Sequence, residues 1–276
     1  MNRDSQPKAS IEHKTLKKGN YSIHYFVSGN ENTETIVFLH PAFGDHRCFD
    51  KQVDYFSPTF KVITLDMPGH GLTGISHSNE KLTDTPMHIL EILQTENCEK
   101  VHIVGVSVGS LLAQSFALQY PEKTLSLTVL GGYDINREQK GIMKAQQKEI
   151  LKWIFKMIFS MDAFRKHVAT TAVINKTEQE RFYESARLFT RKSFAMMSGL
   201  NKLIAERNIV KNYPLLLLSG EKDLPAAILA NKEWHQHEPD CELHIIKNAG
   251  HCANMDNAKE FNEILMNFLT SRTERE

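Results

Sequence analysis

A serine stands between two glycines in residues 105–109, with each glycine two positions away from Ser107. An apolar run, residues 101–104, precedes this stretch, and a helix-like run, residues 111–118, follows it. A Gly-x-Ser-x-Gly turn between a strand and a helix predicts a strained backbone that exposes the serine hydroxyl as a nucleophile. The N–H of Val108, at the start of the helix, is then placed to stabilise an oxyanion. The pattern alone also fits an ordinary glycine-rich turn. A base and an acid elsewhere in the sequence are needed to distinguish a catalytic serine from such a turn.

His251 is the candidate base. It follows Gly250 in a loop of small residues, after the strand-like residues 243–246 and before an amphipathic helix. A serine hydroxyl is a poor nucleophile at neutral pH, and a neutral imidazole that accepts its proton activates it. A loop at the end of a buried strand is where a parallel sheet would deliver such a group.

The acid that orients the base is expected between Ser107 and His251 in the sequence. Asp223 is the first choice, because it lies in the loop after the apolar residues 215–218. A buried carboxylate that accepts the imidazole N–H fixes the tautomer and stabilises the imidazolium. Glu221 and Asp134 are the competing carboxylates.

Short apolar runs bounded by turn residues recur along the chain and predict strands that are buried on both faces. Helix-like stretches, such as residues 86–93 and 111–119, lie between most of them, which predicts a doubly wound, mostly parallel α/β sheet. Residues 21–27 alternate apolar and polar side chains and predict an antiparallel strand. The buried runs are residues 35–39, 62–65, 101–104, 125–130, 215–218 and 243–246.

This alternation stops between residues 133 and 211, which are almost wholly helix-like. Lysines recur there every four residues, at Lys144, Lys148, Lys152 and Lys156, beside a face rich in apolar side chains. Three interpretations are open: a solvated lysine face over a core-facing helix, a lid whose apolar face lines a substrate pocket, or attachment to a membrane surface.

The composition excludes some function classes. The 276 residues carry equal numbers of acidic and basic side chains, 33 of each, which argues against a nucleic-acid binder. The N-terminal residues are polar and no apolar run is long enough for a membrane span, so we expect a cytoplasmic protein without stable membrane association.

The four cysteines lack metal or disulfide spacing and are expected to be free thiols. The sequence leaves the oligomeric state open.

Taken together, these motifs resemble those of the α/β-hydrolase-fold superfamily over nearly the whole chain. The serine, acid and histidine occur in the family's order, and two further loops match: residues 39–44, where the family carries its oxyanion loop, and the Asp-x-Pro-Gly-His-Gly turn at residues 66–71. The resemblance implies a core of residues 1–132 and 212–276, and a helical cap or lid of residues 133–211. His70, within the second loop, is expected to be structural.

The resemblance also implies the remaining site residues. Pro41 replaces the usual glycine and has no N–H, so the oxyanion donors are expected to be Ala42 and Val108, with Phe43 as the fallback donor. Phe43 is also a candidate wall of the acyl pocket. The cap would add the substrate-binding residues Trp153 and Phe159, with Phe194, Met196 and Met197 as further apolar candidates.

The sequence therefore predicts a capped serine hydrolase that cleaves a small, largely apolar carboxylic ester through an acyl-enzyme. C–C bond cleavage of a diketone-type substrate, or lactonase, amidase or thioesterase action, uses the same triad and stays open. A ligand-binding signalling protein on the same fold is the alternative outside catalysis. We expect no cofactor and no metal, since His235 and His237 lack further ligands at metal spacing.

Overall fold

The structure is a computed structural model that describes residues 9–29, 31–32, 34–75, 80–138, 152–153, 155–209 and 211–271. Its strands are β1 (Glu12–Lys18), β2 (Tyr21–Ser28), β3 (Thr35–Leu39), β4 (Lys61–Leu65), β5 (Val101–Val106), β6 (Thr124–Leu130), β7 (Leu215–Gly220) and β8 (Glu242–Ile246). Its α-helices include α1 (Asp50–Phe56), α2 (Thr85–Thr95), α3 (Val108–Gln119), α5 (Met161–Ala172), α6 (Lys176–Ala186), α7 (Pro225–His237), α8 (Ala253–Asp256) and α9 (Ala258–Thr270). Short 3₁₀ segments are η2 (His46–Phe49), η3 (Leu82–Asp84), η4 (Pro121–Lys123), η5 (Lys192–Met197) and η6 (Leu200–Leu203).

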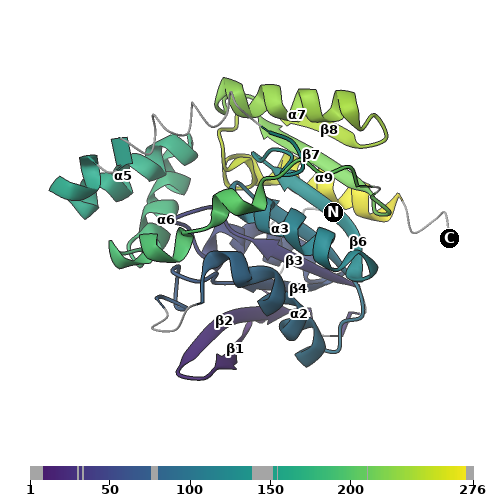
Figure 1. Ribbon diagram of the computed structural model, residues 1–276, viewed down its shortest axis with the longest axis horizontal. Coiled ribbons are helices and arrows are strands. Elements are labelled where there is room, and N and C mark those ends of the chain that lie inside the picture. Colours follow the sequence, from purple (N-terminus) through teal and green to yellow (C-terminus); the bar gives the residue numbers. More distant parts are fainter. Residues whose placement is uncertain are drawn as a thin grey trace.

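The eight strands form one sheet in the order β1-β2-β4-β3-β5-β6-β7-β8. Strand β2 is antiparallel to both of its neighbours, and the strands from β4 to β8 run parallel. The predicted doubly wound, mostly parallel α/β sheet is confirmed (Figure 1). The apolar runs become central strands because their side chains are buried on both faces, as in β3, where all five residues are buried.

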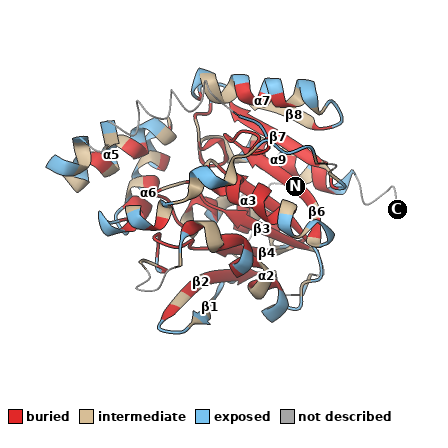
Figure 2. Ribbon diagram, viewed as in Figure 1, coloured by how far each residue is buried: buried red, intermediate tan, exposed pale blue. Residues whose placement is uncertain are grey.

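Helices cover both faces of the sheet, and alternate strand residues supply the two cores. Ile36 and Phe38 pack with side chains of α1 and α9, whereas Val37 and Leu39 pack with side chains of α2, α3 and α7. Figure 2 shows the resulting buried centre, with exposed residues on the outer surfaces of the helices. Burial of such apolar surface is the dominant stabilising contribution to a fold of this type.

Residue types at the helix starts match their positions. Proline occupies the first turn of α2 and of α7, where a helix needs no N–H donor. The side chains of Ser160, Asn175 and Asn257 accept backbone N–H groups at the starts of α5, α6 and α9. These side chains mark where α5 and α6 of the segment between β6 and β7, and α9 at the C-terminal end, begin.

The chain between β6 and β7 holds α5, α6, η5 and η6, and we call residues 131–214 the insertion. In Figure 1, α5 and α6 lie together at the left, beyond the carboxyl ends of the strands. Within the insertion's described part no residue belongs to a strand. Lys144 and Lys148 of the lysine series lie outside the described residues. Among the helices that the structure describes, none has the length and apolar character needed to cross a bilayer.

Candidate active site

The carboxyl ends of the parallel strands gather the candidate residues at one edge of the sheet. The register aligns Leu39 of β3 with Gly105 of β5, and it aligns Leu130 of β6 with Leu218 of β7. His40, Ser107, Asp223 and His251 follow β3, β5, β7 and β8 within a few residues, so their loops meet at this edge. Loops at this edge are where open α/β sheets bind their ligands.

Ser107 occupies the sharp turn between β5 and α3. Its backbone has φ 54° and ψ −120°, a conformation that is unfavourable for a residue with a side chain. Both flanking glycines are required by space: a Cβ on Gly105 would lie 2.4 Å from the carbonyl oxygen of Gly109, and one on Gly109 would lie 2.3 Å from that of Leu39. The backbone N–H of Ser107 donates to the carbonyl of Leu130 at 2.8 Å, which holds the turn against β6.

His251 and Asp223 form a hydrogen-bonded pair, with 2.9 Å between His251 Nδ1 and Asp223 Oδ1. The carboxylate is buried, whereas 22% of the imidazole side chain is exposed. Burial of the imidazole disfavours its protonated form, but the negative charge of Asp223 and its hydrogen bond outweigh this effect and raise the pKa of His251. A carboxylate on Nδ1 assigns the proton to that nitrogen and leaves Nε2 as the basic atom.

The competing carboxylates are engaged elsewhere. Asp134 is buried and accepts the backbone N–H and the side-chain amide of Asn136, at 2.9 and 3.0 Å. Glu221 accepts the backbone N–H of Asn248 at 3.0 Å. Of the three acids considered from the sequence, Asp223 is therefore the one that contacts His251.

The end of β6 contacts both the histidine and the serine turn. A Cβ on Gly131 would lie 3.0 Å from the Cε1 and Nδ1 atoms of His251, so the imidazole packs directly against this glycine. The preceding residue, Leu130, accepts the hydrogen bond from Ser107. Ser107 and His251 thus contact adjacent residues at the end of β6, Leu130 and Gly131.

The loop after β3 adjoins the first turn of α3. The close approach of Gly109 to the carbonyls of Leu39 and His40 places this loop beside Val108. Val108 is the first residue of α3, where a helical N–H has no partner within the helix. In the described part of the chain, the N–H of Ala42 donates to no protein acceptor either. Two free N–H groups near a serine are the donors that an oxyanion requires.

His40 fixes the loop in which Pro41 replaces glycine. Its Nδ1 lies 2.8 Å from the carbonyl of Pro41, and its Nε2 accepts the N–H of Met67 at 3.0 Å. Burial lowers the pKa of His40, and these two partners match a neutral imidazole with its proton on Nδ1. The proline therefore contributes a carbonyl that is held in place, next to the free N–H of Ala42.

Phe43 follows the loop and lies at the centre of an aromatic cluster. Its ring is buried and its backbone has φ 69°. Among the described residues its ring contacts all come from the insertion, with centroid distances between 4.9 and 5.9 Å, to Trp153, Phe164, Phe189 and Phe194. Met196 of η5 packs nearby, against Gly69 of the turn after β4. The insertion thus covers the loop after β3 with aromatic side chains.

The structure brings Phe43 and Trp153 together but leaves Phe159 apart from them. Phe159 is 72% exposed, and its described ring contact is with Phe155, which is itself 65% exposed. Trp153 and Met157 instead pack against the hydrophobic core. The helical period explains the difference, because residues four apart share a face, so Phe155 and Phe159 lie on the other side from Trp153 and Met157.

Known proteins are similar to this chain over most of its length. The family model described as alpha/beta hydrolase fold matches residues 34–258. The chain belongs to this family. A curated relative from Paraburkholderia phymatum, a 2-hydroxy-6-oxononadienedioate/2-hydroxy-6-oxononatrienedioate hydrolase, is 25% identical over 90% of each chain. The 3-oxoadipate enol-lactonase 1 of Acinetobacter baylyi is 23% identical over 89% of this chain and 92% of its own.

A solved structure from a study of Nitrososphaera gargenis carboxylesterases shares the fold of this alpha/beta hydrolase. Its TM-score is 0.77 at 20% identity, over 95% of this chain and 100% of the other. The expected family and the expected fold are thereby confirmed, and so is the expectation of a hydrolase.

Several residues that shape the site were not predicted from the sequence. Phe164 and Phe189 complete the cluster around Phe43. In the sequence their apolar character does not distinguish them from ordinary core residues. Asp256, five positions after His251, accepts the backbone N–H groups of Ile174 and Asn175, about eighty positions earlier, and that of Gly250 in the histidine loop. A carboxylate directly after the histidine loop is a signal that could have drawn attention to it.

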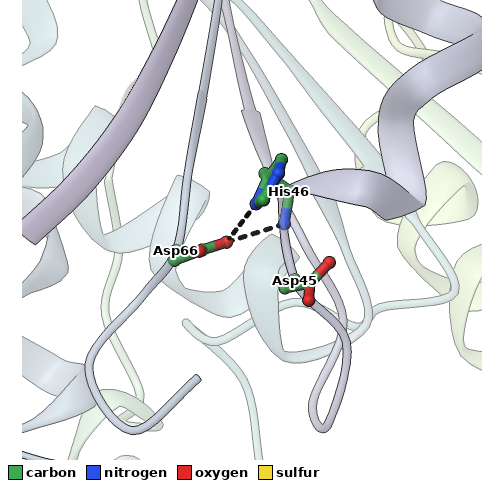
Figure 3. Close-up of side chains that lie close together, drawn as sticks. All are labelled: Asp45, His46 and Asp66. Atoms are coloured by element: carbon green, nitrogen blue, oxygen red, sulfur yellow. Dashed lines mark hydrogen bonds and ion pairs between the residues drawn. The ribbon is translucent and has the colours of Figure 1, made fainter. Parts of the chain in front are cut away.

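A second group of polar residues lies beside β4, where Asp45, His46 and Asp66 place potential ligand atoms within 4.8 Å of one another (Figure 3). Asp66 Oδ1 accepts both the backbone N–H and Nδ1 of His46, each at 2.8 Å, and its other oxygen accepts the N–H of Leu72. Asp45 is paired with Arg47, with 2.5 Å between Nη2 and Oδ2. These oxygens already have donors and a cationic partner, so we assign the group to hydrogen bonding rather than to a metal.

Proposed function

We propose that this alpha/beta hydrolase is a serine hydrolase that cleaves small, largely apolar carboxylic esters. In this mechanism Ser107 attacks the ester carbonyl while Nε2 of His251 accepts its proton. The N–H groups of Ala42 and Val108 stabilise the oxyanion, and Asp223 holds His251 and stabilises its charged form. His251 returns the proton to the leaving alcohol, and water then releases the acyl group by the same steps in reverse.

The observation that carries this proposal is the juxtaposition of a strained serine and a carboxylate-bound histidine. Ser107 keeps an unfavourable backbone at a turn where both flanking positions accept glycine alone. His251, whose Nδ1 is hydrogen-bonded to Asp223, packs against Gly131. The preceding residue, Leu130, accepts the N–H of Ser107. Strain of this kind persists only where the surroundings enforce it, and it is concentrated at functional sites.

The substrate class follows from the cover over the oxyanion loop. Trp153 and Phe194 are partly buried, and beside the buried Phe43 they present ring surface to an acyl or alcohol group. We propose that residues 133–211 act as a cap and that Phe43 and Trp153 line the pocket. Phe159, on the outer surface, is proposed to have at most an indirect part in binding.

Hydrolysis of a C–C bond or of a lactone is the second candidate, because one relative is named as a hydrolase of 6-oxo dienedioates and another as an enol-lactonase. The Paraburkholderia relative is named for dioates, whose two carboxylates call for cationic partners. In the insertion, Arg165 and Arg191 donate to backbone carbonyls of Ala186, Phe189 and Met157. These engaged guanidinium groups and the aromatic lining favour an uncharged ester.

The test is turnover of p-nitrophenyl esters from acetate to octanoate, with Ser107→Ala as the control. We expect multiple turnovers that depend on Ser107 and an optimum at a short or medium acyl chain. Absence of ester turnover together with rapid cleavage of a vinylogous 1,5-diketone would replace the ester proposal with C–C hydrolysis. A single stoichiometric burst, or no reaction with either class, would indicate a ligand-binding protein.

A further inference from the structure

His251 lies between two residues whose backbone N–H groups are both tied to neighbouring elements. The N–H of Gly250 donates to Asp256 Oδ2 at 2.8 Å. The N–H of Cys252 donates at 2.8 Å to the carbonyl of Ala172, the last residue of α5. The imidazole-bearing residue is therefore held on one side by a carboxylate and on the other by the insertion itself.

The same carboxylate also holds the insertion. Asp256 Oδ1 accepts the N–H of Ile174 at 3.0 Å and that of Asn175 at 2.8 Å. These two residues form the corner between α5 and α6, and Asn175 caps α6. The corner also packs on the loop, because a Cβ on Gly250 would lie 3.1 Å from Ile174 Cγ2. One side chain thus joins the histidine loop to a segment about eighty positions earlier in the chain.

Two other carboxylates hold the same loop in a different way. Glu221 accepts the N–H of Asn248 at 3.0 Å, and Glu260 accepts that of Lys247 at 3.2 Å. The described contacts of these two carboxylates lie within the β7–α9 part of the chain. Asp256 differs from them because its oxygens are shared between the loop and the insertion.

We propose that Asp256 is a positioning residue that couples the seating of the α5–α6 corner to the placement of His251. The proposal rests on the proposed function, in which His251 is the catalytic base. Hydrogen bonds from backbone N–H groups to a carboxylate are charge-assisted and short, so they transmit position well. When the corner sits on Asp256, Gly250 is fixed and His251 stays aligned with Asp223. Displacement of the corner releases one side of the histidine loop.

Asp256→Asn tests the coupling with minimal change in shape. Asparagine keeps one acceptor oxygen, and in either orientation its NH₂ group faces a backbone N–H donor, so the hydrogen bonds that join the corner to the loop cannot all persist. A shift of the base by about 1 Å costs on the order of 100-fold in rate. We expect kcat to fall between about 10- and 100-fold with KM changed less than about threefold, because the chemical geometry is affected more than binding.

The pH profile separates positioning from general loss of structure. Loss of alignment with Asp223 removes the effect that raises the pKa of His251, so the acid limb of kcat/KM should move to lower pH in Asp256→Asn. Glu221→Gln and Glu260→Gln are the matched controls, because each neutralises a carboxylate that holds the same loop. They should keep the wild-type kcat within about twofold and leave the acid limb in place, as surface changes usually do.

A second variant breaks the link from the other side. Ile174→Pro removes the N–H that donates to Asp256, and the preceding residue, Val173, is already extended at φ −131° and ψ 137°, as a residue before proline should be. It should lower kcat in the same direction, and the double variant should lose no more than the more severe single variant. If Asp256→Asn does not fold, Ile174→Pro still tests the coupling between the corner and His251.

Amide hydrogen exchange follows the link without any substrate. Exchange at Gly250, Ile174 and Asn175 should become faster together in Asp256→Asn and stay unchanged in Glu260→Gln. If the wild type lacks Ser107-dependent turnover but exchange changes as expected, the proposed function fails and the coupling stands. An active wild type whose Asp256→Asn and Ile174→Pro variants match the two controls in kcat and in the acid limb overturns the coupling.

Discussion

Two histidine–aspartate pairs lie at the ends of strands in this hydrolase. In one, Nδ1 of His251 lies 2.9 Å from Asp223; in the other, Nδ1 of His46 lies 2.8 Å from Asp66. Both carboxylates are fully buried, and both imidazoles are about one-fifth exposed. Taken alone, distance and burial do not distinguish them.

The surroundings of the two pairs differ. Asp66 also accepts N–H groups of His46 and Leu72, and a Cβ on Gly71 would lie 2.2 Å from its carboxyl carbon, so the turn is built around this side chain. Asp223 Oδ1 also accepts the N–H of Leu224 at 2.6 Å, but its Oδ2 has no hydrogen-bond partner in the described structure. The imidazole that it holds packs against Gly131, next to the residue that accepts the N–H of Ser107. A carboxylate whose two oxygens both accept backbone N–H groups stabilises a turn, whereas Asp223 keeps one oxygen without a partner and holds an imidazole, as its proposed catalytic role requires.

Removing the proposed nucleophile is expected to give the largest effect. Ser107→Ala should reduce kcat/KM for a p-nitrophenyl ester by about 10⁴-fold or more, because the covalent step is lost while binding and the oxyanion donors persist. Steady-state rates and circular dichroism on the same preparation measure activity and folding. A folded Ser107→Ala protein with wild-type activity would remove the distinction between the two pairs.

Neutralising each carboxylate separates catalysis from stability. Asp223→Asn should lower kcat by about 10⁴-fold, since the wrong tautomer of His251 is then favoured. Asp66→Asn should keep most of kcat but lower the free energy of unfolding by about 1–3 kcal/mol, because a buried N–H loses its acceptor. Urea unfolding and initial rates give both quantities, with Asp134→Asn as a control that keeps kcat. Loss of activity in Asp134→Asn but not in Asp223→Asn would move the acid to the end of β6.

The pH dependence should reveal the raised pKa of His251. Because the base acts in its neutral form, activity should fall about tenfold per pH unit below an inflection above 6.5. Protonated His251 stabilises the folded state beside Asp223, so this contribution to stability is complete below pH 6.5 and is lost as pH rises through the folded-state pKa. Rates and unfolding free energies across this range should therefore move in opposite directions. A rate that stays constant to strongly acid pH would exclude a histidine base.

The smallest effect is expected in the insertion, where Trp153 and Phe159 form a matched pair. Trp153→Ala should change the relative kcat/KM for short and long acyl esters by roughly 10-fold, because it removes aromatic contact with Phe43. Phe159→Ala should leave the chain-length profile unchanged, because its side chain is 72% exposed. The profile from acetate to octanoate measures both. Unchanged profiles in both variants would exclude Trp153 from the pocket and direct the search to Phe194 and Met196.

The parts that could be predicted from the sequence are those with local signals. Continuous apolar runs identified the central strands, and the glycines around Ser107 identified a turn that tolerates no side chain. Strand β1 carried no such signal: it is a polar edge strand with exposed and half-buried residues, so no apolar run marks it.

Contacts between distant segments could not be predicted where no motif marked the residues. The partners of Asp66 and Asp256 depend on how loops meet after folding, and the cluster around Phe43 joins residues more than a hundred positions apart. Phe159 shows the limit of composition: an aromatic residue beside Trp153 suggests a pocket, whereas the helical period places it on the opposite face.

Labelling with a fluorophosphonate, followed by peptide mass spectrometry, tests the central claim most directly. The account predicts one adduct per chain, on Ser107, which forms quickly in the wild type, much more slowly in Asp223→Asn, and at the wild-type rate in Phe159→Ala. An adduct on a different residue, or a folded wild-type protein that stays unlabelled, would contradict the assignment of Ser107 as the nucleophile.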